Sequence, residues 1–388
     1  MVKALADLGI NVEHLPAQEK IRVLGCGGKI PANEANLFVD NSGTSLRFLT
    51  AMVATGQGTY KLDGSPRMRE RPVADLLQAL NGLGADAKSD LGTGCPPLTV
   101  IATGLDGGNA FVKGDVSSQF LSGLLMSLPY SKDVTTVEVD GVLVSQPYVA
   151  MTLNVMEAFG VRVENRKNRR FDVRPGKYKG RTYVIEPDAS AASYFFALAA
   201  ITGGTITVEG LGSTSVQGDM GFLDVLEHMG CEVERTADET TVSGGPLKGV
   251  DVDMNAISDT VMTLAVVALF ASGHTRIRNV AHIRHKETDR ISALATELRK
   301  LGATVEEKPD GLLIIPPDHG KITPASIATY KDHRMAMSFA LAGVKAGGVT
   351  IQDPGCVAKT YPRFWEDLEK LRKESALGPG SDLESRLA

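Results

Sequence analysis

One pattern recurs five times along the chain, at intervals of 70 to 76 residues. It is an apolar stretch that ends in Leu-Gly, Phe-Gly or Met-Gly and precedes alternating Val and acidic residues; its glycines are Gly9, Gly84, Gly160, Gly230 and Gly302, so successive differences are 75, 76, 70 and 72. A Ser/Asp/Gly cluster that opens a run of small apolar residues recurs in step, beginning at Gly43, Ser118, Ala189, Asp259 and Asp332. Such a period indicates repeated supersecondary units that stack or close on one another.

The first copy of the repeat has no opening cluster. In the later units the cluster lies 41 to 43 residues before the glycine, as Gly43 does before Gly84. The matching position for Gly9 would fall roughly 33 residues before Met1. We therefore expect six units with an incomplete first unit. A unit without its first strands leaves an edge that can pair with another chain, so we expect a monomer capable of self-association through such edges.

The fourth unit shows what one repeat builds. Asp188 can cap a helix over 189–201, and residues 205–210 alternate as a strand. A second helix over 222–229 ends at Gly230, and two strands follow, with residues 182–187 expected as a leading strand. The unit is therefore βαβαββ. Once the absent first opening is counted, three openings fall on each side of Glu186, which predicts an α/β protein with domains at 1–185 and 186–372 and a disordered polar tail at 373–388.

Composition and charge exclude several classes of protein. The net charge is −5, the pI is near 5.9 and no run of five Lys or Arg occurs, which argues against a nucleic-acid partner. No apolar run of 18 residues exists, so we predict no membrane span. The four cysteines lie far apart without a CxxC pair, which favours a reduced compartment. We expect a cytoplasmic protein, or a plastid protein if the source is a eukaryote.

The repeated openings predict an anion site. Each places small hydroxyls, glycines or charges at a helix N-terminus, where free N–H groups and the helix dipole attract anions. A single cap of this kind is ordinary, but several in register beside Arg, Gln or His favour a phosphate and carboxylate site in a cleft between the domains. Basic residues beside these openings are Arg67, Arg69, Arg71, Lys286, Arg290, His333, Arg334 and Lys359. Glu287, flanked by Lys286 and Arg290, can stay ionised as a base.

Several longer segments then resemble one family. They are NSGTSLR, LDGSPRMRERP, GDVSSQFLSGLLM, SQPYVAMTL, PDASAASYFFALAAITGG, VMTLAVVAL, RHKETDRI, DHRMAMSFALAG and KTYPRFWEDL, in the family's order. From about Met1 to Leu371 the chain resembles 5-enolpyruvylshikimate-3-phosphate (EPSP) synthases. The resemblance implies a two-domain, inside-out α/β barrel of βαβαββ units, three per domain. It also implies transfer of the enolpyruvyl group of phosphoenolpyruvate to the 5-hydroxyl of shikimate 3-phosphate, a step of the shikimate pathway to chorismate and the aromatic amino acids.

The resemblance also implies roles for individual residues. Phosphoenolpyruvate would contact Gly43, Thr44, Arg67, Gln119, Arg290, Arg334 and Lys359. Shikimate 3-phosphate would contact Ser117, Ser118, Gln119, Ser145, Tyr148, Asp259, His282 and Lys286, with Lys286 serving both substrates. Asp259 would take the proton of the 5-hydroxyl, and Glu287 would manage the proton at the methylene carbon. No metal and no redox cofactor is implied.

Departures from the family keep alternatives open. The family's N-terminal Lys-Ser…Asn-Arg segment has no counterpart here, which predicts impaired activity and leaves a non-catalytic or split anion-binding remnant as an alternative. UDP-N-acetylglucosamine enolpyruvyl transferases typically carry a cysteine in the loop where this chain has Pro66 and Arg67. RNA 3′-phosphate cyclases have related repeats, but the acidic balance speaks against them.

Overall fold

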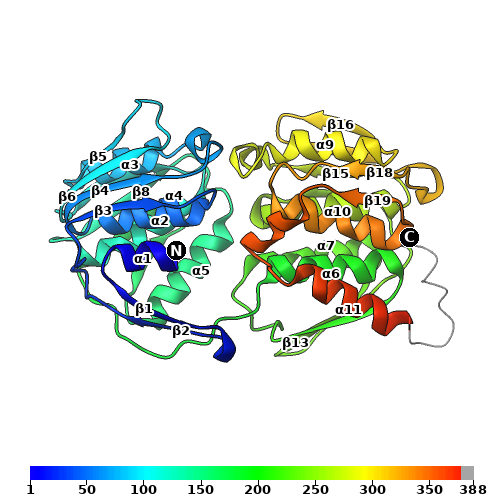
Figure 1. Cartoon of the computed structure of the whole chain (residues 1–388), viewed down its shortest axis with the longest axis horizontal. Coiled ribbons are helices and arrows are strands. Elements are labelled where there is room, and N and C mark those ends of the chain that lie inside the picture. Colours follow the sequence, from blue (N-terminus) through cyan, green and yellow to red (C-terminus); the bar gives the residue numbers. More distant parts are fainter. Residues whose placement is uncertain (377–388) are drawn as a thin grey trace. The chain divides into compact units, whose positions relative to one another are not determined.

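The computed structural model describes residues 1–376, and the chain divides into two compact units, Met1–Val184 and Ile185–Ala388 (Figure 1). Each unit is treated by itself. The polar tail expected at 373–388 begins too early, because residues 373–376 form the end of helix α11 (Phe364–Ala376). The remainder of that predicted tail lies outside the described residues.

The first unit contains two complete βαβαββ repeats. One comprises β3 (Glu34–Phe38), α2 (Gly43–Val53), β4 (Gln57–Asp63), α3 (Ala74–Gly82), β5 (Asp86–Ser89) and β6 (Leu98–Thr103). The next comprises β7 (Gly108–Lys113), α4 (Ser118–Ser127), β8 (Thr135–Asp140), α5 (Gln146–Ala158), β9 (Val163–Arg166) and β10 (Arg170–Val173). Their sheets run β3-β4-β6-β5 and β7-β8-β10-β9, and in each the first pair is parallel and the others are antiparallel.

The second unit repeats this order once in full. The complete copy comprises β14 (Asp251–Asp253), α8 (Val261–Val267), β15 (Thr275–Arg278), α9 (Arg290–Lys300), β16 (Thr304–Lys308) and β17 (Gly311–Ile315), in the order β14-β15-β17-β16. The fourth repeat comprises α6 (Ala189–Thr202), β11 (Thr205–Glu209), α7 (Phe222–Met229), β12 (Glu232–Arg235) and β13 (Glu239–Ser243). The sixth comprises β18 (Ala325–Ile327), α10 (His333–Ala346) and β19 (Val349–Ile351), followed by α11.

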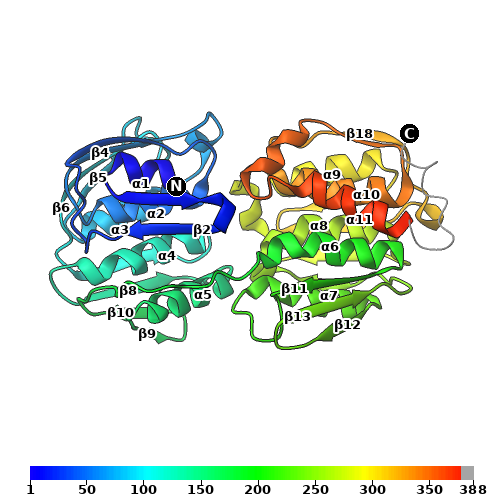
Figure 2. The ribbon, with the colours of Figure 1, turned by 60° about the horizontal axis from the view of Figure 1, so that its bottom comes forward.

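The first repeat is partial, as the spacing predicts. It contains helix α1 (Val2–Asp7) and the antiparallel strands β1 (Asn11–Leu15) and β2 (Lys20–Leu24), which form a two-stranded sheet of their own (Figure 2). By analogy with β5 and β6, β1 and β2 are the closing strands of a repeat. Ile21, Val23 and Leu24 on β2 are exposed.

The leading strand expected over 182–187 does not form, so the sheet of the fourth repeat has three strands. Val184 and Ile185 are 86% and 80% exposed. Glu186 instead turns back on the 215–217 loop, where its carboxylate accepts hydrogen bonds from Ser215 Oγ (2.6 Å) and Gln217 Nε2 (2.9 Å). These side-chain bonds hold the segment in an irregular path, and backbone pairing with β11 is absent from the described strands.

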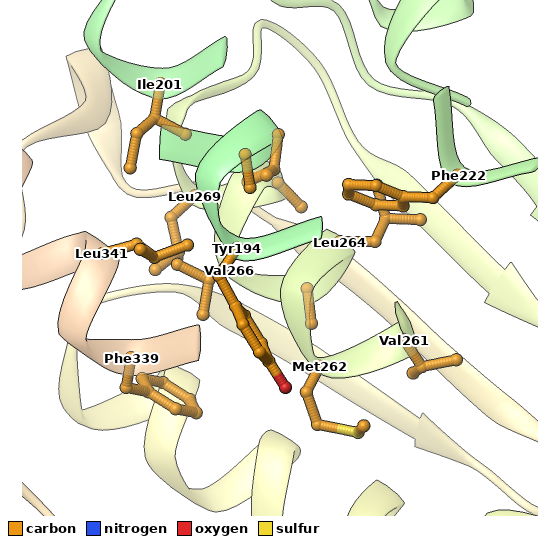
Figure 3. Close-up of a cluster of buried hydrophobic side chains, with 14 of the residues drawn as sticks. Tyr194, Ile201, Phe222, Val261, Met262, Leu264, Val266, Leu269, Phe339 and Leu341 are labelled. Atoms are coloured by element: carbon orange, nitrogen blue, oxygen red, sulfur yellow. The ribbon is translucent and has the colours of Figure 1, made fainter. Parts of the chain in front are cut away.

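Helix caps and apolar packing fix the ends and the positions of the helices in the second unit. Asp188 caps α6 by accepting the N–H groups of Ser190 and Ala191, and Gly230 ends α7 with φ +111°. Helices α6, α8 and α10 pack against one another around a buried apolar cluster (Figure 3). The cluster includes Tyr194 and Phe339, whose rings lie between these helices. The polar N-terminal ends of α8 and α10 are thereby held beside one rigid core.

Two further findings concern the described part of the chain. Its four cysteines are free thiols. Among its helices, none combines the length and the apolar character needed to cross a bilayer.

Candidate functional site

A network of seven charged side chains lies at the N-terminal ends of α9 and α10 in the second unit. Lys286 Nζ lies 3.0 Å from Asp259 Oδ1, and Arg334 Nη2 lies 2.9 Å from Asp259 Oδ2. Lys359 pairs with Glu287. The other members are Arg290 and Asp332, so four cations face three carboxylates and the formal charge is +1.

Arg290 is the centre of this network. Its Nε and Nη2 donate to both oxygens of Asp332, at 2.7 and 3.2 Å, while Nη2 also reaches Glu287 Oε2 at 3.0 Å. Its Nη1 donates to Asp259 Oδ1 at 3.1 Å. The Arg290 side chain is 1% exposed, whereas the partly accessible cations are Lys286, Arg334 and Lys359. Arg290 therefore organises three carboxylates from inside, and the other cations lie nearer to solvent.

Asp332 connects the network to helix α10. It is fully buried, and its carboxylate also accepts the N–H of Arg334 at 3.0 Å, which caps the helix. One carboxylate thus fixes both the guanidinium of Arg290 and the first turn that carries Arg334. The sequence identified this position only as a helix opening, because nothing in the local pattern shows that its partner lies 42 residues away.

Opposing electrostatic effects act on Asp259. Burial alone would raise the pKa of Asp259, but the charges of Arg334, Lys286 and Arg290 outweigh burial and hold this pKa well below its usual range. Burial lowers the pKa of Lys286, and Asp259 opposes that change. The carboxylate is ionised at neutral pH, but it is a weak base while all three cations contact it.

Two histidines beside the network are neutral at physiological pH. Burial, together with the charge of Lys286, lowers the pKa of His282 to about 4. Burial and the charge of Arg334 lower the pKa of His333 to about 3. At neutral pH both imidazoles can donate or accept hydrogen bonds without adding positive charge. Among the described residues, no group of three or more His, Cys, Asp and Glu is arranged to hold a metal ion.

The opening at Asp259 differs from the expected helix cap. Residues 255–260 form a short 3₁₀ helix, and α8 begins only at Val261. Asp259 lies within this 3₁₀ turn, and its carboxylate turns toward Lys286 and Arg334. The Asp259 carboxylate accepts hydrogen bonds from Lys286, Arg290 and Arg334, and within the described part of the chain the N-terminus of α8 has no side-chain cap.

A second cluster joins α2 and α4 in the first unit. Ser42 and Ser117 cap these helices by accepting the N–H groups of Ser45 and Gln119. The Gln119 amide bridges the helices, because Oε1 accepts from Arg47 Nη1 at 2.7 Å and Nε2 donates to Thr44 Oγ1 at 2.9 Å. The structure therefore brings together Thr44 and Gln119, two of the candidate residues.

Two buried arginines complete this cluster. Arg47 is 4% exposed and lies over the ring of Phe120, and Arg71 is 3% exposed and donates to the carbonyl of Asn41 at 3.1 Å. A Cβ on Gly43 would lie only 2.4 Å from Arg71 Nη2, so glycine allows the guanidinium to approach the start of α2. From the sequence, Arg71 was recognisable only as a cation in a loop, and nothing but its place in NSGTSLR pointed to a role for Arg47.

The remaining candidates of the first unit are Arg67, Ser118, Ser145 and Tyr148. Arg67 is 32% exposed in its side chain and pairs with Glu70 at 2.8 Å. Ser118 is buried in the first turn of α4. Ser145 precedes α5 in a left-handed conformation, with φ +53°, and Tyr148 lies in the first turn of that helix. Helices α4 and α5 are in contact through Ser122 and Thr152, 2.8 Å apart.

Comparison with known proteins decides the family. The family model described as EPSP synthase (3-phosphoshikimate 1-carboxyvinyltransferase) matches residues 1–368. The chain belongs to the EPSP synthase family. It is 51% identical over 374 residues to the 3-phosphoshikimate 1-carboxyvinyltransferase of Nostoc punctiforme, covering 95% of this chain and 87% of that protein. It is also 51% identical over 393 residues to the chloroplastic enzyme of Arabidopsis thaliana, covering 96% of this chain and 75% of the relative.

A solved structure agrees with this assignment. The EPSP synthase from Acinetobacter baumannii superposes with a TM-score of 0.77 at 26% identity, covering 95% of this chain and 86% of that one. The predicted resemblance and the α/β fold are therefore confirmed. No substrate contact was expected from the sequence for Asp332, Arg47 or Arg71, which hold other charged or polar groups of the two clusters in place.

Proposed function

We propose that this chain transfers the enolpyruvyl group of phosphoenolpyruvate to the 5-hydroxyl of shikimate 3-phosphate and releases phosphate. Family membership over residues 1–368 supports the reaction. The observation that carries the assignment to residues is the convergence of four cations on Asp259 and Glu287. A site of this composition suits a substrate that carries both a phosphate and a carboxylate.

The cations would bind phosphoenolpyruvate. Arg334, Lys286 and Lys359 are partly accessible and can each offer N–H donors to its phosphate or carboxylate. Arg290 would complete the pocket from inside, and we assign Arg67, Gly43, Thr44 and Gln119 to the same substrate. The Arg67 side chain is partly exposed, and Gly43 and Thr44 lie at the N-terminal end of α2, where free backbone N–H groups attract anions; both features support this assignment.

Shikimate 3-phosphate would bind mainly through neutral donors. Ser117, Ser118 and Gln119 cluster at the start of α4, where a phosphate can accept from hydroxyls and free backbone N–H groups. Ser145 and Tyr148 lie at the start of α5. Lys286, neutral His282 and Asp259 would contact the substrate from the second unit.

Two carboxylates would move the protons. The 5-hydroxyl oxygen would attack C2 of phosphoenolpyruvate and lose its proton to Asp259, while C3 would gain a proton from Glu287 in its acid form. The Glu287 carboxylate would then take a proton back from C3, so that the C2–C3 double bond re-forms as the C2–O bond to phosphate breaks and phosphate leaves with the proton held by Asp259. Asp259 is a weak base while three cations contact it. Substrate phosphate and carboxylate groups that take over those cations would raise its basicity as they bind.

Phosphate release by the purified chain tests this proposal. Release should require both phosphoenolpyruvate and shikimate 3-phosphate, and Glu287→Gln should lower kcat by about 10²–10⁴-fold with little change in substrate affinity. The exposed Glu306→Gln is the matched control. Binding of both substrates without turnover would instead favour the anion-binding remnant. Turnover with UDP-N-acetylglucosamine in place of shikimate 3-phosphate would contradict the assigned acceptor.

The same proposal extends to the setting of the protein. We propose a monomer without a metal or redox cofactor, acting in the cytoplasm, or in a plastid if the source is a eukaryote. The chloroplastic location of the Arabidopsis relative supports the second setting.

A further inference from the structure

Glu297 is a fully buried carboxylate outside the network already described. It lies on α9, two helical turns after Arg290 and on the same face of the helix. Tyr330 Oη donates to its Oε1 at 2.7 Å, and the N–H of Ala328 donates to its Oε2 at 3.1 Å. Lys300 Nζ, at 2.7 Å, supplies the neutralising charge.

These bonds hold an unusual turn. Tyr330 and Lys331 are consecutive non-glycine residues with φ of +54° and +56°. Left-handed conformations are uncommon for such residues and persist only where surrounding contacts fix them. The N–H of Asp332 donates to the carbonyl of Thr329 at 2.8 Å and closes the turn. Glu297 therefore binds residues in the first half of the turn, and Asp332 is the residue at its end.

The turn delivers a residue of the charged network. Asp332 follows Lys331 directly, contacts Arg290 through two hydrogen bonds and caps the helix that carries Arg334. Helix α9 thus contacts the segment 328–332 at two points, through Glu297 near its end and through Arg290 at its start. A change in the turn would move Asp332, and with it both arginines assigned to phosphoenolpyruvate.

We infer that Glu297 is a positioning residue for phosphoenolpyruvate binding, acting through Tyr330 and the left-handed turn on Asp332, Arg290 and Arg334. The inference rests on the proposed function, because that function assigns the two arginines to phosphoenolpyruvate. On this inference, binding of phosphoenolpyruvate should depend on Glu297 more than binding of shikimate 3-phosphate does. Shikimate 3-phosphate is assigned mainly to residues that the turn does not hold, and Asp259 is the one among its assigned contacts that pairs with the two arginines, so its binding should change much less.

Separate KM measurements for the two substrates test the inference. Tyr330→Phe removes one donor to Glu297, and it should raise the KM for phosphoenolpyruvate about fivefold to tenfold. The KM for shikimate 3-phosphate should stay within about twofold of the wild type. Glu297→Gln should act in the same direction, because its amide N–H groups face donors. In the double variant, the fold-rise in the KM for phosphoenolpyruvate should be smaller than the product of the two single fold-rises, because both changes break the same hydrogen bond.

Thr240→Val is the matched control. Thr240 is buried on β13, and its hydroxyl donates to the carbonyl of Leu211 at 2.8 Å, so the change also removes one buried hydrogen bond from the second unit. It should lower the melting temperature comparably while leaving both KM values unchanged. Folded Tyr330→Phe and Glu297→Gln proteins with unchanged KM values, or with equal rises for both substrates, would overturn the inference.

Deuterium exchange separates this inference from the proposed function. A wild-type chain without turnover would count against the proposed function, but the turn can still be examined in the same proteins. Backbone amides of 332–334 should exchange faster in Tyr330→Phe than in Thr240→Val. Equal exchange in the two variants would show that Glu297 does not position this segment.

Discussion

Replacing Asp332 by Asn tests how much the second unit depends on its buried charge network. The carboxylate accepts two hydrogen bonds from Arg290 and one from the N–H of Arg334. Asn keeps one oxygen, which can still cap α10, but its amide N–H groups then face the Arg290 guanidinium. The substitution also removes one of the negative charges that surround a cation whose side chain is 1% exposed.

The size of the effect follows from this geometry. Breaking a buried ion pair costs about 3–5 kcal/mol, because the remaining charge stays buried. Arg290 keeps Glu287 and Asp259, at 3.0 and 3.1 Å, so we expect the lower end, about 3 kcal/mol in the free energy of unfolding. For a domain of this size, that loss corresponds to a fall of about 6–12 °C in the melting temperature of the second unit.

The single tryptophan makes the measurement specific. Trp365 lies on α11 in the second unit, and its indole N–H donates to the carbonyl of Pro354 at 3.0 Å. Its fluorescence during urea unfolding at pH 7 reports on that unit, whereas circular dichroism reports on both. Asp318→Asn, at an exposed position, should change the stability by less than about 0.5 kcal/mol. A loss below about 1 kcal/mol in Asp332→Asn would refute the reasoning.

Three further predictions concern other parts of the chain. Gln119→Ala should weaken substrate binding about fivefold to tenfold by calorimetry, because it removes the bridge between Arg47 and Thr44. Burial lowers the pKa of His282 from 6.5 to about 4, so between these values the unfolded chain binds a proton that the folded protein does not. His282 should therefore contribute a loss of about 1.4 kcal/mol of stability per pH unit as the pH drops through this window, and His282→Asn should reduce the slope by about that amount in urea titrations, while His333, whose pKa is lowered to about 3, still contributes its own slope. Ile21→Lys on the exposed face of β2 should reduce self-association in sedimentation velocity; an unchanged profile would count against edge pairing there.

Local structure was predictable because each repeat contains the residues that begin and end its own helices and strands. The cap at Asp188, the left-handed Gly230 and the paired strands of the fourth repeat all follow from side chains close in sequence to the backbone groups that they satisfy. The period also predicted which repeat is partial. Where a competing contact came from another loop, prediction failed, as at residues 182–187, where Glu186 is bound by Ser215 and Gln217.

The charged network was only half predictable. Motif order placed Lys286, Glu287 and Arg290 in one segment, but their partners outside that segment, Asp259, Asp332 and Lys359, come from three separate parts of the chain. Ion pairs such as Arg290–Asp332 depend on how helices pack, and packing is encoded in apolar residues that carry no mark of the site. The same limit applies to Arg47 and Arg71, whose burial results from tertiary contacts rather than from local sequence.

The network explains why the site combines so many carboxylates with its cations. Four cations without partners would repel one another and would lose solvation on burial, so Asp259, Glu287 and Asp332 stabilise them in place. The three carboxylates differ in accessibility. Asp332 is fully buried and stays bound to Arg290, whereas Asp259 and Glu287 pair with the partly accessible cations. A substrate phosphate or carboxylate can therefore displace Asp259 and Glu287 from those cations without disturbing the Arg290–Asp332 pair. Anion binding would thus free the two carboxylates assigned to proton transfer at the moment when their substrates are present.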